Sequence, residues 1–152
     1  MTSEAASVPL PHTWRPLGPR IAGGVAAGVL VVMALFLWFT FDEETRDAIT
    51  PFQRGTVIAF GAAMLAALFA LVRSRVVAEP ERLTVVNGYR RRDFEWAEVL
   101  AVRLPPGAPW VTLDLADGNT VPAMGIQSSD GARAKVAVRE LRTLVDHPPN
   151  LG

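Results

Sequence analysis

The 152-residue sequence has no cysteine, and its 15 basic residues balance its 15 acidic residues. Without cysteine the chain has no disulfide, no thiolate metal site and no cysteine nucleophile. A net charge of zero gives no overall field that would attract nucleic acid. The two histidines, His12 and His147, lie in the terminal segments, far in sequence from other metal-ligating residues. We therefore expect no nucleic-acid partner, no metal site and no cofactor.

The sequence also lacks the common motifs of catalysis. It has no Gly-x-Ser-x-Gly, no phosphate-binding glycine loop and no His-Glu-x-x-His. Asp114 and Asp117 form a carboxylate pair, but a turn at Asp117-Gly118 accounts for Asp117 without a metal. Ser128 and Ser129 are interpreted as helix caps. The sequence thus predicts a protein that is not an enzyme.

Charged residues are absent from two long apolar runs, residues 21–41 and 56–72. As helices these runs are about 31 Å and about 26 Å long, against about 30 Å for a bilayer core. Arg54 and Arg73 at the ends of the shorter run can reach the headgroups. The first run is longer than the core of a signal peptide and is followed by no cleavage site. We expect a hairpin of two transmembrane helices over residues 21–72.

Arginines on either side of the runs predict the orientation of this hairpin. The loop of residues 42–55 carries two arginines, whereas five lie on the other side of the runs: Arg15, Arg20, Arg73, Arg75 and Arg82. Basic residues near a span favour the cytoplasmic side. We therefore expect a multi-pass protein of the cell membrane, with both termini in the cytoplasm and the loop outside.

Small residues recur at helical spacing in both runs. They are Gly24 and Gly28 in the first, and Ala62, Ala66 and Ala70 in the second. Such faces let helix backbones approach closely in lipid. One interpretation is a homo-oligomer, or docking onto the helices of a partner; the other is packing of the hairpin against itself. Neither run contains an ionisable residue, which argues against a role in transport.

After the second run the apolar pattern changes to a period of two, which indicates β-strands. Asn87-Gly88 favours a tight hairpin of type I′. A cap at residues 128–130 and apolar positions at helical spacing then predict a C-terminal helix that ends before Pro148. The sequence predicts an α+β domain over residues 76–146, flanked by a flexible tail at 1–20 and a short tail at 147–152. The expected strands are Val76–Ala78, Leu83–Val86, Tyr89–Trp96, Val99–Leu104, Trp110–Leu115 and Asn119–Met124.

Several short segments match a known group of proteins. They are Arg75-Val76-Val77-Ala78, Leu83-Thr84-Val85, Arg91-Arg92, Phe94-Glu95-Trp96-Ala97-Glu98-Val99, Trp110-Val111-Thr112-Leu113-Asp114-Leu115, Asp117-Gly118 and Ile126-Gln127. With the order of the elements, they resemble the bacterial pleckstrin-homology-like (PH-like) domains of actinobacterial membrane proteins, in the family that includes low-molecular-weight protein antigen 6. The resemblance implies an antiparallel curved sheet forming a partly open barrel, capped by the C-terminal helix. It implies no reaction, but binding of lipid through basic residues of a hairpin or of peptide along a sheet edge.

Basic residues of the predicted domain gather at one hairpin. Arg90, Arg91 and Arg92 follow the predicted turn, and Arg73 and Arg75 follow the second apolar run. Near an anionic membrane each arginine contributes on the order of 1 kcal/mol. The alternative is a solvated hairpin whose charge is neutralised by three neighbouring acids, Asp93, Glu95 and Glu98. Trp96 and Trp110 are expected to fill the core, and the alternative is an exposed recognition platform.

These observations favour a non-enzymatic, membrane-anchored interaction module that binds a protein partner, the anionic lipid surface, or both. The alternative is an accessory subunit that docks through its transmembrane helices onto a larger membrane complex, with Gly24, Gly28, Ala62 and Ala66 in the contact. The first function requires residues 76–146, whereas the second requires only the hairpin.

Overall fold

A computed structural model describes residues 8–149 and divides the chain into two compact units. One unit is helical and runs from Pro19 to Val72. The other combines the chain up to Gly18 with the chain from Arg73 onward. The second unit is therefore discontinuous in sequence, and the helical unit is an insertion within it.

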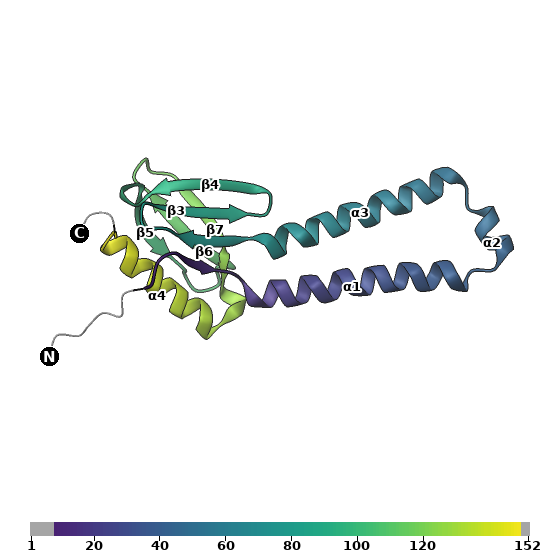
Figure 1. Ribbon diagram of the computed structural model, residues 1–152, viewed down its shortest axis with the longest axis horizontal. Helices are drawn as coiled ribbons and strands as arrows, with labels where there is room; N and C mark the ends of the chain where they lie inside the picture. Colours follow the sequence, from purple (N-terminus) through teal and green to yellow (C-terminus); the bar gives the residue numbers. More distant parts are fainter. Residues whose placement is uncertain (1–7, 150–152) are drawn as a thin grey trace. The chain divides into compact units, whose positions relative to one another are not determined.

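The helical unit consists of α1 (Leu17–Thr40), α2 (Glu43–Ala48) and α3 (Pro51–Arg73). The two long helices lie side by side and are joined by the short α2 (Figure 1). Both are long and apolar enough to cross a membrane, with mean hydropathies of 2.4 and 2.3. Asp42 caps α2 by accepting a hydrogen bond from the Thr45 backbone N–H at 2.8 Å, and the hydrogen bonds from Thr45 lower the pKa of Asp42.

The contact between α1 and α3 passes through Gly23, the buried residue of α1. A Cβ atom there would lie 3.0 Å from Cγ2 of Val72. Partial burial recurs at helical spacing on both helices, at Ala27 and Leu30 of α1 and at Gly61, Leu65, Leu68 and Val72 of α3. Gly24 and Gly28 lie outside this contact, and a Cβ on either would meet no atom within 4 Å.

The discontinuous unit contains a four-stranded antiparallel sheet in the order β1 (His12–Trp14), β2 (Arg75–Ala78), β3 (Arg82–Asn87), β4 (Arg90–Glu95). Trp14 pairs with Val76, so the two ends of the helical insertion leave from neighbouring strands. Asn87 pairs with Arg90, which leaves Gly88 and Tyr89 as the central residues of the β3–β4 turn. Of these two residues only Gly88 has a positive φ, 59°, which is the arrangement of a type II′ turn. The predicted hairpin is confirmed, but its predicted type I′ turn is wrong, because Asn87 stays in the strand.

The second sheet has the order β5 (Val99–Arg103), β6 (Trp110–Leu115), β7 (Thr120–Gln127), and α4 (Ala132–Asp146) packs beside β5. Two short 3-10 turns, η1 (Trp96–Glu98) and η2 (Ser128–Asp130), precede β5 and α4. At Gly125 the strand β7 passes against β2. A Cβ there would lie 2.5 Å from backbone atoms of Arg75 and Val76, so only glycine permits this approach. The two sheets and α4 enclose one apolar core, consistent with a PH-like fold.

Tryptophans contribute to this core in a way that only partly matches the expectation. Trp96 is buried, as expected, and its indole N–H donates to the Glu79 carbonyl at 3.0 Å. Trp110 is only half-buried, so its expected place in the core is wrong. The inner positions of β6 belong to Val111, Leu113 and Leu115, and Trp110 lies on the opposite face. Trp14, which the sequence did not single out for the core, is 7% exposed.

The expected flexible tail over residues 1–20 is wrong in its second half. Residues 12–14 form β1, and α1 begins at Leu17. The reason is Trp14, whose buried indole N–H donates to Oε2 of Glu140 on α4 at 2.8 Å. The predicted domain boundary at residue 76 therefore omits one strand. Residues 1–7 and 150–152, which belong to the two predicted tails, lie outside the described residues.

The expected cap of the C-terminal helix is also wrong. Gly131, with φ 57°, precedes the first turn of α4, and Asp130 bonds elsewhere. Its two carboxylate oxygens accept hydrogen bonds from the backbone N–H groups of Leu17 and Gly18, both at 2.8 Å. Asp130 thus caps the first turn of α1, which has no acidic residue of its own, by accepting from its free N–H groups.

Candidate functional site

The β3–β4 turn is fixed to two other parts of the domain. The Gly88 backbone N–H donates to Oγ of Ser74, the buried residue that follows α3, at 3.0 Å. The Asn87 amide donates to the Pro122 carbonyl at 2.5 Å and accepts from the Met124 backbone N–H at 2.9 Å. The turn is therefore hydrogen-bonded both to the residue that follows α3 and to β7.

A tyrosine and an arginine meet at this turn. The guanidinium of Arg73, the last residue of α3, lies 5.6 Å from the ring centroid of Tyr89. Tyr89 is 60% exposed at the second central position of the turn. The sequence analysis included Arg73 but missed Tyr89. Tyr89 is the one tyrosine of the chain and directly precedes three arginines, and this pattern could have indicated it as a candidate.

The three arginines of β4 are all exposed, but their surroundings differ. Arg91 forms an ion pair with Asp93, Nη2 to Oδ1 at 3.1 Å. Arg92 lies over the ring of Phe94 at 5.4 Å. Within the part of the chain that the structure describes, Arg90 and Arg75 form no ion pair. Arg90 and Arg75 therefore remain available to an external anion.

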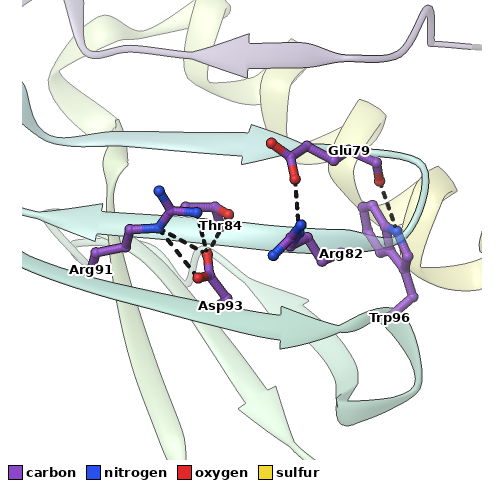
Figure 2. A network of polar contacts seen from close by, with 6 residues as sticks. All are labelled: Glu79, Arg82, Thr84, Arg91, Asp93 and Trp96. Carbon is purple, nitrogen blue, oxygen red and sulfur yellow. Dashed lines mark hydrogen bonds and ion pairs between the residues drawn. The ribbon is translucent and has the colours of Figure 1, made fainter.

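The negative charge beside Arg91 is held in place by a small network (Figure 2). Oδ1 of Asp93 accepts a hydrogen bond from the Thr84 hydroxyl at 2.5 Å and one from Nε of Arg91 at 3.1 Å. The hydrogen bond from Thr84, followed by that from Arg91, lowers the pKa of Asp93. Asp93 therefore stays ionised at neutral pH and neutralises Arg91.

The other two acids expected to neutralise the hairpin act elsewhere. Glu98 accepts a hydrogen bond from the Glu95 backbone N–H at 2.7 Å, as part of a reciprocal cap on η1. Glu95 ends β4, five residues beyond Arg90. The expected neutralisation of the hairpin charge therefore holds for Arg91. It does not hold for Arg90, which is nearest the turn.

The remaining carboxylate candidates have structural roles. Asp114 forms an ion pair with Arg103 across β5 and β6. Asp117 accepts a hydrogen bond from the Asn119 backbone N–H at 2.9 Å, and this bond lowers the pKa of Asp117. Over residues 8–149 no group of three His, Cys, Asp or Glu side chains is placed to hold a metal ion.

Small residues of the apolar helices divide into two sets. Gly23 belongs to the α1–α3 contact and Gly61 is half-buried, whereas Gly24, Gly28 and Ala62 are exposed. Ala66 is also exposed and Ala70 is half-buried. The α1–α3 contact therefore does not pack the Gly24 and Gly28 face of α1 against the alanine face of α3.

Three curated proteins are similar to the chain over most of its length. An uncharacterized protein of Mycobacterium bovis and two of Mycobacterium tuberculosis are each 31% identical to the chain over 138 residues, covering 89% of it and 85% of the relative. Residues 73–144 match the bacterial PH domain. The chain belongs to one family with these mycobacterial proteins, and its residues 73–144 are similar to the bacterial PH domain. The match to the bacterial PH domain begins at Arg73. Strand β1, at residues 12–14, therefore lies outside the matched region. No solved structure matches the chain significantly.

Proposed function

We propose that the chain is a non-enzymatic interaction module anchored in the cell membrane. Helices α1 and α3 span the membrane as a hairpin, and the PH domain lies in the cytoplasm with both termini. The domain binds the anionic lipid surface, a protein partner, or both. Within the bacterial PH family we group it with the low-molecular-weight protein antigen 6 proteins, which also carry two spans before the domain.

The pairing of β1 with β2 is the observation that carries this proposal. Trp14 precedes the helical insertion and Val76 follows it, and they are partners in one sheet. Both ends of the insertion must then lie on the same side of a membrane, which requires an even number of crossings. Two helices of sufficient length, each with a long uncharged run, supply that number. The excess of arginines beside both ends supports the cytoplasmic side.

The β3–β4 turn is the part of the domain best suited to the membrane surface. Tyr89 and Arg90 are exposed at the turn, and the bond from Gly88 to Ser74 holds them one residue beyond the end of α3. Tyrosine and arginine are the residues that favour the interfacial region of a bilayer. The adjacent strand β4 is the last strand of its sheet, so its outer edge remains open to a partner strand.

Membrane topology can be tested directly because the chain has no native cysteine. We expect a membrane-impermeant maleimide to label Thr45→Cys on intact cells, and to label Lys135→Cys only after permeabilisation. Labelling of both positions on intact cells would place the two on one outer face and contradict a cytoplasmic domain. Release of the protein by alkaline carbonate would contradict anchoring itself.

A second function, docking through the spans, is favoured by the position of Gly24 and Gly28. Because the α1–α3 contact uses Gly23, these two glycines leave a close-approach face unused within the hairpin. In-cell crosslinking of the full chain separates the two functions. The interaction module predicts loss of partners in Arg90→Glu/Arg91→Glu/Arg92→Glu, whereas the accessory subunit predicts loss in Gly24→Leu/Gly28→Leu. Arg139→Glu, an exposed arginine of α4, is the control for charge alone.

A further inference from the structure

A groove of about 510 Å³ lies between β1 and α4, on the flank of the domain that does not include the β3–β4 turn. The strand forms one wall and the helix the other, and Gly125 and Ile126 of β7 lie between them. In Figure 1, β1 runs beside α4. The groove is lined on its helical side by Ala134, Val136 and Ala137, and Val136 is 42% exposed. It therefore offers an apolar interior to a ligand.

Two carboxylates line the groove, and both already have partners. Asp130 accepts hydrogen bonds from the N–H groups of Leu17 and Gly18. Glu140 accepts the indole N–H of Trp14, and Nε2 of His12 lies 3.8 Å from its Oε2. These hydrogen bonds fix the orientation of both carboxylates, and each carboxylate keeps its negative charge.

Two arginines also line the groove, Arg15 directly after β1 and Arg133 in the first turn of α4. Both are exposed, and neither forms an ion pair among the residues that the structure describes. They come from opposite walls, so both line the space that a ligand between the walls would occupy. A guanidinium binds phosphate oxygens through two parallel hydrogen bonds, which makes an anionic phosphate the matching ligand chemistry.

The position of the groove along the chain decides the source of the phosphate. Arg15 precedes the first residue of α1 by two residues, and Asp130 is bonded to the first two N–H groups of that helix. If α1 spans the membrane, its first turn lies at the level of the lipid headgroups. The groove then opens where headgroups are concentrated.

We propose that this groove binds the headgroup of an anionic phospholipid, with Arg15 and Arg133 on the phosphodiester and the apolar interior against the glycerol and first acyl carbons. The inference rests on the membrane anchoring proposed above. It adds a lipid site separate from the β3–β4 turn. An extended acidic peptide laid along β1 is the competing occupant, but β1 is only three residues long and offers few backbone bonds.

The test uses the full chain in phosphatidylcholine nanodiscs, with and without phosphatidylglycerol. Native mass spectrometry counts the lipids that the protein retains. We expect wild type to retain phosphatidylglycerol over phosphatidylcholine. We expect Arg15→Ala/Arg133→Ala to reduce this preference about thirtyfold, because each arginine near an anionic headgroup contributes on the order of 1 kcal/mol. Arg139→Ala is the matched control, since Arg139 is an exposed arginine of α4 that does not line the groove.

A second measurement reports on the groove itself. The indole N–H of Trp14 bonds to Glu140 in the groove wall, so its NMR signal should shift when glycerophosphoglycerol, the soluble headgroup, is added. Glycerophosphocholine should leave the signal unchanged. Trp14→Phe assigns the signal among the four tryptophans.

Three results would overturn the proposal. The first is unchanged phosphatidylglycerol retention in Arg15→Ala/Arg133→Ala. The second is a Trp14 shift with inorganic phosphate alone and no lipid preference, which would assign the groove to free phosphate. The third is a shift only with an acidic peptide, which would make it a peptide site. Alkaline carbonate extraction distinguishes failure of the lipid site from failure of membrane anchoring. If carbonate releases the wild-type protein from membranes, the anchoring itself is contradicted.

Discussion

Two antiparallel strand pairs of the same sheet differ in how they are connected. Strands β3 and β4 are joined by Gly88 and Tyr89 alone. Strands β1 and β2 are joined by the 60 residues from 15 to 74, including both long helices. The loop-closure entropy of a flexible connection would differ by about 3 kcal/mol between these lengths. A short turn can set the register of a pair by itself, whereas a connection of 60 residues cannot.

What replaces the turn in the β1–β2 pair is a set of contacts from the other end of the chain. Trp14 is fixed by Glu140, and the first N–H groups of α1 are fixed by Asp130. Gly125 lets β7 lie against the first residues of β2. The difference shows that a domain can accept a large insertion between neighbouring strands when side chains elsewhere hold both ends.

The largest expected effect comes from removing the side chain that holds β1. We expect Trp14→Ala to reduce the free energy of unfolding of the domain by about 3–5 kcal/mol, because a buried indole and its hydrogen bond are lost. Hydrogen exchange should show loss of protection in residues 75–78, the partner strand. Trp110→Ala, at a half-buried site on the outer face of β6, is the control and should cost less than half as much. Equal effects would mean that β1 is not held by Trp14.

A smaller effect is expected at the short turn. Asn87→Ala removes one hydrogen bond to Pro122 and one from Met124, and leaves these part-buried backbone groups without the Asn87 side chain as a partner. We expect a loss of about 2 kcal/mol in urea unfolding. Asn119→Ala, whose side-chain amide bonds only to Asp117 in an exposed turn, should change stability by less than about 0.5 kcal/mol. A neutral Asn87→Ala would show that the two turn residues suffice to fix this pair.

The smallest effect concerns the charge network on the β3–β4 pair. Thr84→Val removes the hydroxyl that bonds to Asp93, so the pKa of Asp93 should rise toward its usual value. A carboxyl with a lowered folded pKa stabilises the fold above its unfolded pKa of about 3.9, and this contribution disappears as pH falls through the folded value. The variant should therefore lose less stability on acidification than wild type. An NMR titration of the Asp93 carboxyl measures the shift, and an unchanged midpoint would contradict the role of Thr84.

The sequence predicted most elements of the domain because they carry a clear period. Strand β6 alternates buried and exposed residues along its whole length, and α4 buries Ala134, Ala137, Val138, Leu141 and Leu144. The two apolar helices were equally clear, because no charge interrupts them. In each case burial of one face follows directly from the local pattern.

The rest depended on contacts distant in sequence. Strand β1 has three residues, too few for a period, and its partner lies more than 60 positions away. Asp130 looked like a cap for the following helix, but its hydrogen bonds go to Leu17 and Gly18. The groove arginines, Arg15 and Arg133, are 118 positions apart and were not grouped. Arg90 and Arg91 look alike in the sequence, and only the position of Asp93 distinguishes them.

The separation of β1 from β2 also affects the order of events during synthesis. At about 5–20 residues per second, β1 is translated roughly 3–12 s before its partner strand. Glu140, which holds Trp14, is made later still. During that interval β1 is an unpaired strand on a growing chain. Its length of three residues and its flanking residues, Pro11 and Pro16, leave it few ways to pair with anything else before the ribosome finishes.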